Sequence, residues 1–167
     1  MNGNLLRIPN SELKIILKNS KLLEDITKSN ILEDKILINI GQSWEAIYYI
    51  LTGRILAEWD DEPQPLSWIM FNLEQFVDEE QDFGYGPANY STSEQVKQIS
   101  KKLKPITGPD IKKAYRSNEM LELQIYPAGF WDDKEETKTL LIENFEKLKQ
   151  LYADAAEKNE AVIAYLN

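Results

Sequence analysis

The 167-residue chain contains no cysteine and no histidine. Without cysteine it can form no disulfide, no thiolate metal site and no cysteine nucleophile. Without histidine it lacks both the commonest zinc ligand and the side chain that most often acts as a general base near neutral pH. The two absences together exclude every Ser-His and Cys-His catalytic arrangement.

Long apolar segments are absent too. No uninterrupted apolar run is longer than that from Ala46 to Leu51, whereas a helix that spans a bilayer needs about 20 apolar residues. The opening sequence MNGNLLRIPN has no apolar stretch of the length that a signal peptide requires. We therefore expect a cytoplasmic protein that does not bind a membrane.

Length and composition indicate one domain. Single domains usually have about 100–200 residues, and a hydrophobic content of 43% is enough to build a core. No internal repeat or linker-like segment divides the chain. We expect residues 1–167 to form a single compact domain.

The hydrophobic pattern predicts an α+β fold that is predominantly helical and has a small sheet. Leu5, Leu6 and Ile8 form an opening strand that Pro9 ends. Residues 55–59 alternate like a strand, and residues 161–166 are apolar enough for a buried closing strand. The periodicity predicts helices over about 10–17, 20–28, 41–52 and 134–158. It also predicts a helix that ends at about residue 103, one that begins near residue 107 and a short one that begins near residue 117.

Several helix ends carry recognisable capping signals. Asn10 or Ser11 can cap the first helix, and Ser117 a later one. Gly53 suits the left-handed position that closes the helix over 41–52. Ahead of the helix that ends at 103, two pairs have the spacing of a capping box, namely Ser91 with Glu94 and Thr92 with Gln95.

The net charge of -9 is unevenly distributed along the chain. Nine acids lie between Glu58 and Asp82, and residues 55–96 contain no lysine or arginine. Without those nine, the remaining acids equal the 19 basic residues in number. The following stretch, Lys97 to Arg116, has seven basic residues and a single acid, Asp110.

Three interpretations of this polarity remain open. The acidic and basic stretches can simply be solvated surfaces that meet across the fold. The acidic stretch can instead attract a basic protein, because a concentrated field of one sign accelerates association. Nucleic acid is the weakest interpretation, since the chain is acidic overall and its basic stretch lacks aromatic stacking platforms.

Two motif-like segments do not meet the requirements of a cofactor or metal site. Gly84-Tyr85-Gly86 follows no hydrophobic strand and lacks the third glycine of a dinucleotide fingerprint, because Asn89 stands there. The run Asp78 to Asp82 begins like a calcium loop, but Phe83 occupies the place of the turn glycine. We expect neither a cofactor nor a metal.

Aromatic residues gather near the turns and one helix. Such residues usually pack in a core, but several of them around a few polar groups can also line a ligand pocket. The residues concerned include Trp44, Tyr48, Tyr85, Tyr90, Tyr126 and Trp131.

Four segments in the same order make the chain similar to the YfbM-like proteins, uncharacterised bacterial proteins grouped as a domain of unknown function. They are Trp44 to Gly53, Gly84 to Tyr90 before a capped helix, Ile125 to Pro127 with Trp131 shortly after, and the closing helix and strand. The resemblance covers nearly the whole chain and implies an α+β fold and a cytoplasmic bacterial protein. It supplies no reaction.

This sequence departs from the resembled family at one helix. Family members often carry histidines where this chain has Glu45 and Tyr48. Any metal or proton-transfer role of those histidines would therefore be lost here. We interpret the shared pattern around Trp44 and Gly53 as a packed helix with its end-cap.

Two classes of function follow from these observations. The first is a non-enzymatic interaction protein, immunity-like or regulator-like toward a basic partner protein, which binds through Asp60, Asp61, Asp78, Glu79, Glu80 and Asp82. The alternative is a small-molecule-binding protein or enzyme with an aromatic pocket where Gly53 and the segments 85–90 and 126–131 meet.

Overall fold

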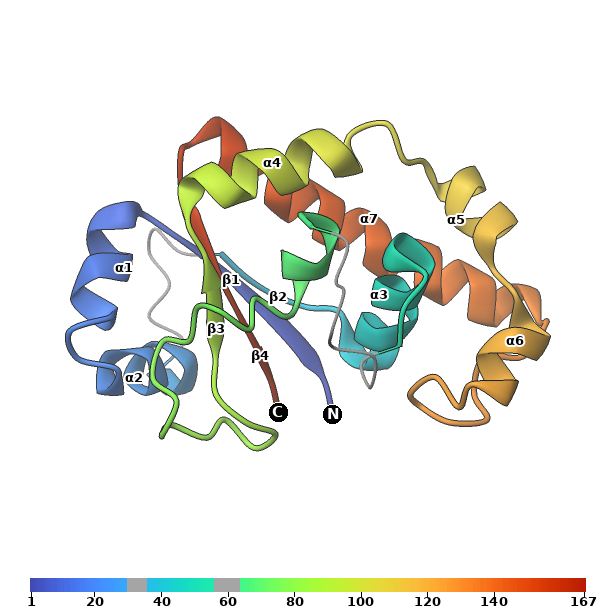
Figure 1. Cartoon of the computed structure of the whole chain (residues 1–167), viewed down its shortest axis with the longest axis horizontal. Coiled ribbons are helices and arrows are strands. Elements are labelled where there is room, and N and C mark those ends of the chain that lie inside the picture. The colour runs from blue at the N-terminus through green and yellow to red at the C-terminus, as the bar shows by residue number, and fades with distance from the viewer. Residues whose placement is uncertain (30–35, 56–63) are drawn as a thin grey trace.

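The computed structural model describes residues 1–29, 36–55 and 64–167, which form an α+β fold around a small antiparallel sheet (Figure 1). The strands are β1 Gly3–Ile8, β2 Ile36–Asn39, β3 Asn89–Ser91 and β4 Ala161–Leu166. The α-helices are α1 Asn10–Ile16, α2 Lys21–Ser29, α3 Trp44–Thr52, α4 Ser93–Leu103, α5 Gly108–Ala114, α6 Ser117–Glu122 and α7 Glu135–Glu157. Short 3-10 turns, η1 Gly41–Ser43 and η3 Leu66–Ile69, precede α3 and follow the second gap. The expected class, helical with a small sheet, is confirmed.

The sheet has the order β2-β1-β4-β3, so the first and last strands of the chain form its centre. Every residue of β1 and β4 is buried, and Leu5 pairs with Ala164 while Leu6 pairs with Ile163. Main-chain hydrogen bonds between Asn2 and Asn167 continue this pairing past the strand ends. The two termini therefore lie side by side (Figure 1).

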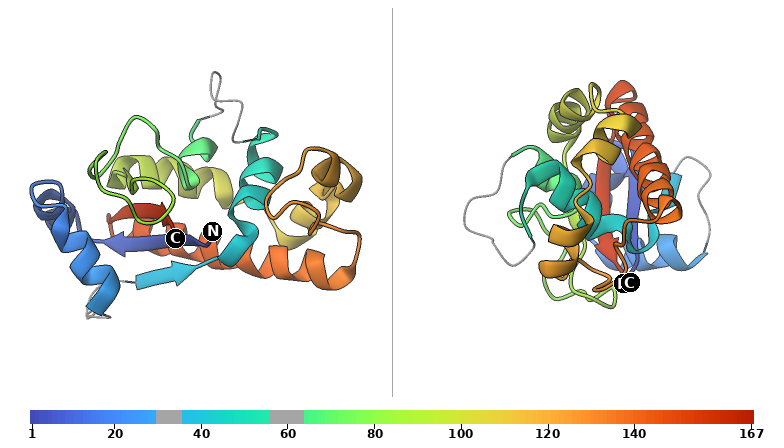
Figure 2. Two further views of the ribbon diagram at one scale, coloured as in Figure 1. Left: turned by 90° about the horizontal axis from the view of Figure 1, so that it is seen from below. Right: turned by 90° about the vertical axis from the view of Figure 1, so that its right-hand side faces the viewer.

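Because side chains alternate along a strand, the central strands contribute to two separate cores. Leu5, Val162 and Ala164 belong to the larger core, which includes residues of α3, α4 and α7. Leu6 and Ile163 belong to the smaller core with residues of α1 and α2. Figure 2 shows how α7 extends beyond the sheet toward α5 and α6.

Local signals place several helix ends correctly. Thr92 and Gln95 form the capping box of α4, Thr107 caps α5, and Gly53 ends α3 in the left-handed region at φ 70°. Asn10 and Ser117 do not cap their helices, and there the prediction is wrong. Pro9 and Arg116 occupy those cap positions without a side-chain bond.

The strands are predicted less completely than the helices. Ile55 lies outside any strand, and the rest of the expected strand over 55–59 lies outside the described residues. The three-residue β3 follows from no alternation in the sequence; it forms because Asn89 to Ser91 pair with β4. Within the described ranges, no helix combines the length and the apolar character needed to cross a bilayer.

Candidate functional site

One end of the sheet borders a partly open cavity of about 540 Å³, within the range of about 300–1,000 Å³ typical of small-molecule sites. We call it the aromatic pocket. It is lined by Met1, Trp44, Met70, Phe71, Leu73, Phe76, Tyr85, Gly86, Pro87, Asn89, Tyr165 and Leu166.

Trp44, the first residue of α3, forms an inner wall of the aromatic pocket. Its side chain is only 2% exposed. Its ring lies 5.5 Å from that of Phe71 in an edge contact and 5.6 Å from that of Tyr126 in a stacked one. Trp44 also lies close to Gly3 of β1. The absence of a side chain at Gly3 makes this closeness possible, because a Cβ there would lie 2.8 Å from the Cβ of Trp44.

The turn that carries Tyr85 forms the outer wall. Oδ1 of Asp82 accepts hydrogen bonds from the main-chain N–H groups of Gly84, at 2.7 Å, and Gly86, at 2.9 Å. These two bonds hold the pKa of the Asp82 carboxyl below its usual value. Both glycines have a positive φ that other residues rarely adopt. Tyr85 is thereby held at the opening, 58% exposed.

Asn89 anchors the floor of the aromatic pocket through its own side chain. Its Oδ1 accepts from the main-chain N–H of Asn72 at 3.1 Å, and its Nδ2 donates to the carbonyl of Met70 at 2.7 Å. Since these bonds occupy the amide, little of it remains for a ligand. Asn89 therefore fixes Met70 and Phe71 beside β3.

The chemistry available in the aromatic pocket is that of binding. Its lining holds no acidic, lysine or arginine side chain. The polar side-chain groups besides the Asn89 amide are the hydroxyls of Tyr85 and Tyr165 and the indole N–H of Trp44, which has no hydrogen-bond partner among the described residues. Burial raises the pKa of the Tyr165 hydroxyl, so this group stays protonated at neutral pH and can act as a hydrogen-bond donor or acceptor.

The structure brings some of the sequence-predicted aromatic residues together. Trp44 and Tyr85 line the pocket. Tyr126 stacks behind Trp44, and its hydroxyl accepts from the α-amino group of Met1 at 2.6 Å. Tyr48 is buried and contacts Phe71 with a ring separation of 5.9 Å.

The other predicted positions lie away from the pocket lining. Tyr90 packs against the smaller core. Trp131 is buried and donates from Nε1 to the carbonyl of Tyr126. Gly53 lies at the opposite end of α3 from Trp44.

Sequence reasoning missed four large residues of this lining, namely Met70, Phe71, Phe76 and Tyr165. The segment from Leu66 to Phe71 is apolar except for Ser67, but its pattern predicts neither a helix nor a strand. Tyr165 lies in the apolar segment 161–166, whose pattern predicts a buried strand and gives no sign of a pocket.

In the described part of the acidic stretch, residues 64–82, Asp78 and Asp82 accept hydrogen bonds from neighbouring groups of the fold. Asp78 accepts from the Ser20 hydroxyl at 2.7 Å and from the main-chain N–H of Glu80 at 3.0 Å, and these bonds lower the pKa of its carboxyl. Asp78 and Asp82 thus organise the loop, whereas Glu79 and Glu80 are exposed. Asp60 and Asp61 lie outside the described residues.

The basic stretch after residue 96 does not neutralise this loop. Lys97 pairs with Glu94 at 2.8 Å and Lys112 with Glu135 at 2.6 Å. In the part of the chain that the structure describes, no ion pair joins Lys97 to Arg116 with the acids between 64 and 82. The same part holds no cluster of three or more acidic side chains placed to bind a metal.

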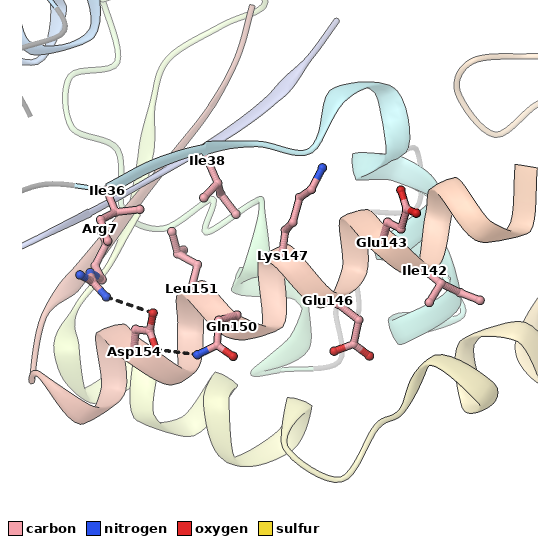
Figure 3. Close-up of a pocket in the computed structure, with 10 residues that line it drawn as sticks. All are labelled: Arg7, Ile36, Ile38, Ile142, Glu143, Glu146, Lys147, Gln150, Leu151 and Asp154. Carbon is pink, nitrogen blue, oxygen red and sulfur yellow. Dashed lines mark hydrogen bonds and ion pairs between the residues drawn. The ribbon is translucent and has the colours of Figure 1, made fainter.

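A second, more open cavity of about 650 Å³ lies between β2 and α7, and we call it the β2–α7 groove (Figure 3). At one end lies Arg7, which is 3% exposed. Its Nε is 2.8 Å from Oε2 of Glu160, and its Nη1 is 3.4 Å from Oδ2 of Asp154. The groove is lined by Arg7, Ile36, Ile38, Ile142, Glu143, Glu146, Lys147, Gln150, Leu151 and Asp154.

Comparison with known proteins identifies a family and a solved structure with a similar fold. A family model described as "Domain of unknown function (DUF1877)" matches residues 1–165. The crystal structure of YfbM from Escherichia coli, a protein of unknown function, has a TM-score of 0.72 to this chain at 15% identity, and the match covers 98% of each chain. At this identity the likeness shows the fold alone. No curated protein matches the chain.

Proposed function

Because the chain belongs to the family described as a domain of unknown function (DUF1877), which brings no reaction with it, we propose a function from the geometry. The protein binds a small, uncharged, ring-containing molecule in the aromatic pocket. The single observation that carries this proposal is a partly open cavity of about 540 Å³ with an almost wholly apolar wall of aliphatic, aromatic and methionine side chains.

The composition of the wall supports an uncharged ligand. A cation would lose its hydration without gaining an ionic partner, because the lining has no acidic side chain. An anion would meet no lysine or arginine side chain there, only the α-amino group of Met1, one of whose N–H groups donates to the Tyr126 hydroxyl. An apolar ring instead gains burial of about 25 cal/mol per Å² together with favourable aromatic contacts.

The arrangement of the wall supports a site that is formed before the ligand arrives. Trp44 is fixed between Phe71 and Tyr126, and Asn89 fixes the main chain at Met70 and Asn72. Asp82 holds the turn that carries Tyr85. A rigid wall lowers the entropic cost of binding.

Nile red, a neutral planar dye whose emission shifts to the blue in apolar surroundings, tests the proposal. We expect the wild-type protein to bind it at one site and Tyr85→Ala to weaken the affinity about five- to tenfold. Phe130→Ala is the matched control, because Phe130 is an exposed aromatic residue outside the pocket lining. Equal affinities for all three proteins would refute the assignment.

A pocket-filling substitution gives an independent test. Leu73→Trp places a larger side chain in the lining, so we expect it to reduce dye binding by about tenfold or more. Leu123→Trp makes the same exchange at an exposed position on another surface and should leave dye binding unchanged. The thermal midpoint of each variant, measured in parallel, distinguishes a blocked pocket from an unfolded protein.

A further inference from the structure

The strand β2 forms one edge of the sheet and has a free side. Among the described residues only β1 pairs with it. The main-chain N–H of Ile40 donates to the carbonyl of Gly3 at 2.9 Å, and in an antiparallel ladder hydrogen-bonded and non-hydrogen-bonded pairs alternate. It follows that Leu37 and Asn39 direct their main-chain N–H and C=O groups away from β1.

The β2–α7 groove runs beside this free side. Ile36 and Ile38 project from β2 over the side chains of α7 (Figure 3). Ile36 is 44% exposed, which is unusual for a large aliphatic residue on an edge strand. Leu151 supplies further apolar surface from α7.

The far rim of the groove is acidic. Glu143 and Glu146 on α7 line it and are exposed, and neither makes an ion pair with another described residue. Among the residues that line the groove, Lys147 is the basic residue without an ion pair; its Nζ donates to Oδ1 of Asn144 at 3.1 Å. Arg7 is already matched by Asp154 and Glu160.

An apolar floor with an acidic rim suits lysine and arginine side chains. Such a side chain can lay its methylene stem along Ile36 and Ile38 and place its charge near Glu143 or Glu146. A free strand edge adds main-chain hydrogen bonds to any extended segment that lies along it.

We infer that an extended, basic segment of a partner protein docks on β2 as a fifth strand and places lysine or arginine side chains in the β2–α7 groove. Residues that lie directly opposite each other share a face of the sheet. The basic side chains therefore stand opposite Ile36 and Ile38. The alternate residues stand opposite Leu37 and Asn39 and make the main-chain bonds.

Charge favours a basic partner over a second copy of the chain in this place. The protein has a net charge of -9, so two copies repel each other. A two-fold pairing through β2 would also bring Glu143 and Glu146 of both copies toward the same interface. A basic segment is instead attracted both by the net negative charge of the protein and by the carboxylates of Glu143 and Glu146.

The probe is a fluorescently labelled peptide of sequence KVKVKVKV with blocked ends, and its anisotropy is measured against the 167-residue chain at low and at raised salt. We expect salt-sensitive binding. Ile36→Arg blocks the groove and repels the peptide, so the affinity should fall about tenfold or more. Ile15→Arg is the matched control, because it adds the same charge at a 54% exposed isoleucine on α1.

The rim charges give a test with a predicted sign. The double exchange Glu143→Gln with Glu146→Gln should weaken the peptide about three- to tenfold, and Lys147→Gln should strengthen it about two- to fivefold. The control Glu122→Gln with Glu136→Gln removes two exposed acids elsewhere and should cause a smaller change than the rim exchange.

The peptide itself separates strand pairing from simple attraction. KPKPKPKP keeps every lysine but lacks the N–H groups that would bond to β2, so it should bind at least about fivefold more weakly. Equal binding of both peptides, or equal binding by wild type and Ile36→Arg, would overturn the inference. A wild-type dimer in analytical ultracentrifugation that Ile36→Arg converts to a monomer would overturn it too, in favour of a second copy.

Discussion

Arg7 Nε lies 2.8 Å from Glu160 Oε2, and this ion pair joins the central strand β1 to the residue that precedes β4. The side chains are 4% and 12% exposed, so both charges are largely removed from water. Asp154 near the end of α7 adds a second carboxylate at 3.4 Å. The three groups therefore fix the end of α7 over the sheet, at one end of the β2–α7 groove.

Removing the cation from this group should be costly. Arg7→Met leaves the carboxylate of Glu160 buried without its partner, so we expect the free energy of unfolding to fall by about 3–5 kcal/mol. Adding Glu160→Gln removes that stranded charge and should restore part of the loss. Urea unfolding of the two single variants and the double variant measures the coupling. Additive losses in the double variant would show that the two side chains do not interact.

Gly3 is predicted to tolerate no side chain. In Gly3→Ala the new Cβ would lie 2.8 Å from the Cβ of Trp44, an atom tied closely to the α3 backbone. We expect a loss of about 1–3 kcal/mol in unfolding free energy, together with weaker Nile red binding because Trp44 lines the aromatic pocket. Gly108→Ala is the control. Its Cβ would lie 3.0 Å from the Cγ2 methyl of Ile142 and 3.8 Å from Oε1 of Glu146, both ends of side chains that can move aside, so urea unfolding should register a smaller loss.

The turn at Tyr85 should depend on the ionised form of Asp82. The pKa of this carboxyl is lowered by the N–H groups of Gly84 and Gly86, so its stabilising effect is fully present above the ordinary Asp pKa of about 3.9 and is lost as the pH falls through the lower folded value. The amide NMR shifts of Gly84 and Gly86 should follow that titration, while that of Gly129 should not. A midpoint at or above the ordinary value would contradict the assignment.

Asp82→Ala tests the same turn at neutral pH. We expect the variant to remain folded, because Asp82 is exposed, but to bind Nile red about two- to fivefold more weakly as Tyr85 loses its fixed position. Glu79→Ala is a suitable control, since it removes an exposed acid from the same loop.

Features that depend on nearby residues were predictable from the sequence. The capping box of Thr92 with Gln95 is set by residues three positions apart. The core face of α7 follows from the helical period, because residues three or four positions apart lie on one face, and the buried residues of this face are Leu141, Phe145, Leu148, Tyr152 and Ala155. The cap at Asn10 failed because its side chain instead donates to the Ser93 hydroxyl and the carbonyl of Asn159, which are contacts across the fold.

The candidate site depends on such distant contacts, and the sequence therefore predicted it only in part. Trp44 and Tyr85 could be singled out as aromatic residues near turns. That Phe71 and Tyr165 join them follows only from the fold, which brings the segment after η3 and the strand β4 to the same cavity. Likewise, the acidic run from Asp78 to Asp82 is visible as charge, but the hydrogen bonds that engage Asp78 and Asp82 depend on the folded loop.

The buried hydroxyl of Tyr152 should contribute to stability at neutral pH. Its ring is 1% exposed, and its hydroxyl donates to the main-chain carbonyl of Ile69 at 2.8 Å, which joins α7 to η3. Tyr152→Phe leaves that buried carbonyl without its donor, so we expect a loss of about 1–3 kcal/mol in unfolding free energy at neutral pH. Urea unfolding at neutral pH measures it.

The same hydroxyl should make stability depend on alkali. Burial raises the pKa of Tyr152 in the folded state, so its contribution is complete below the unfolded pKa of about 10 and is lost as the pH rises above it, by about 1.4 kcal/mol per pH unit. Burial also raises the pKa of Tyr49 and of Tyr115 to about 12, but both remain in Tyr152→Phe. The difference between wild type and variant, followed by urea unfolding from neutral pH to pH values above about 10, therefore isolates Tyr152. It should shrink as the pH rises, and a constant difference would mean that Tyr152 ionises within the folded protein as readily as in the unfolded chain.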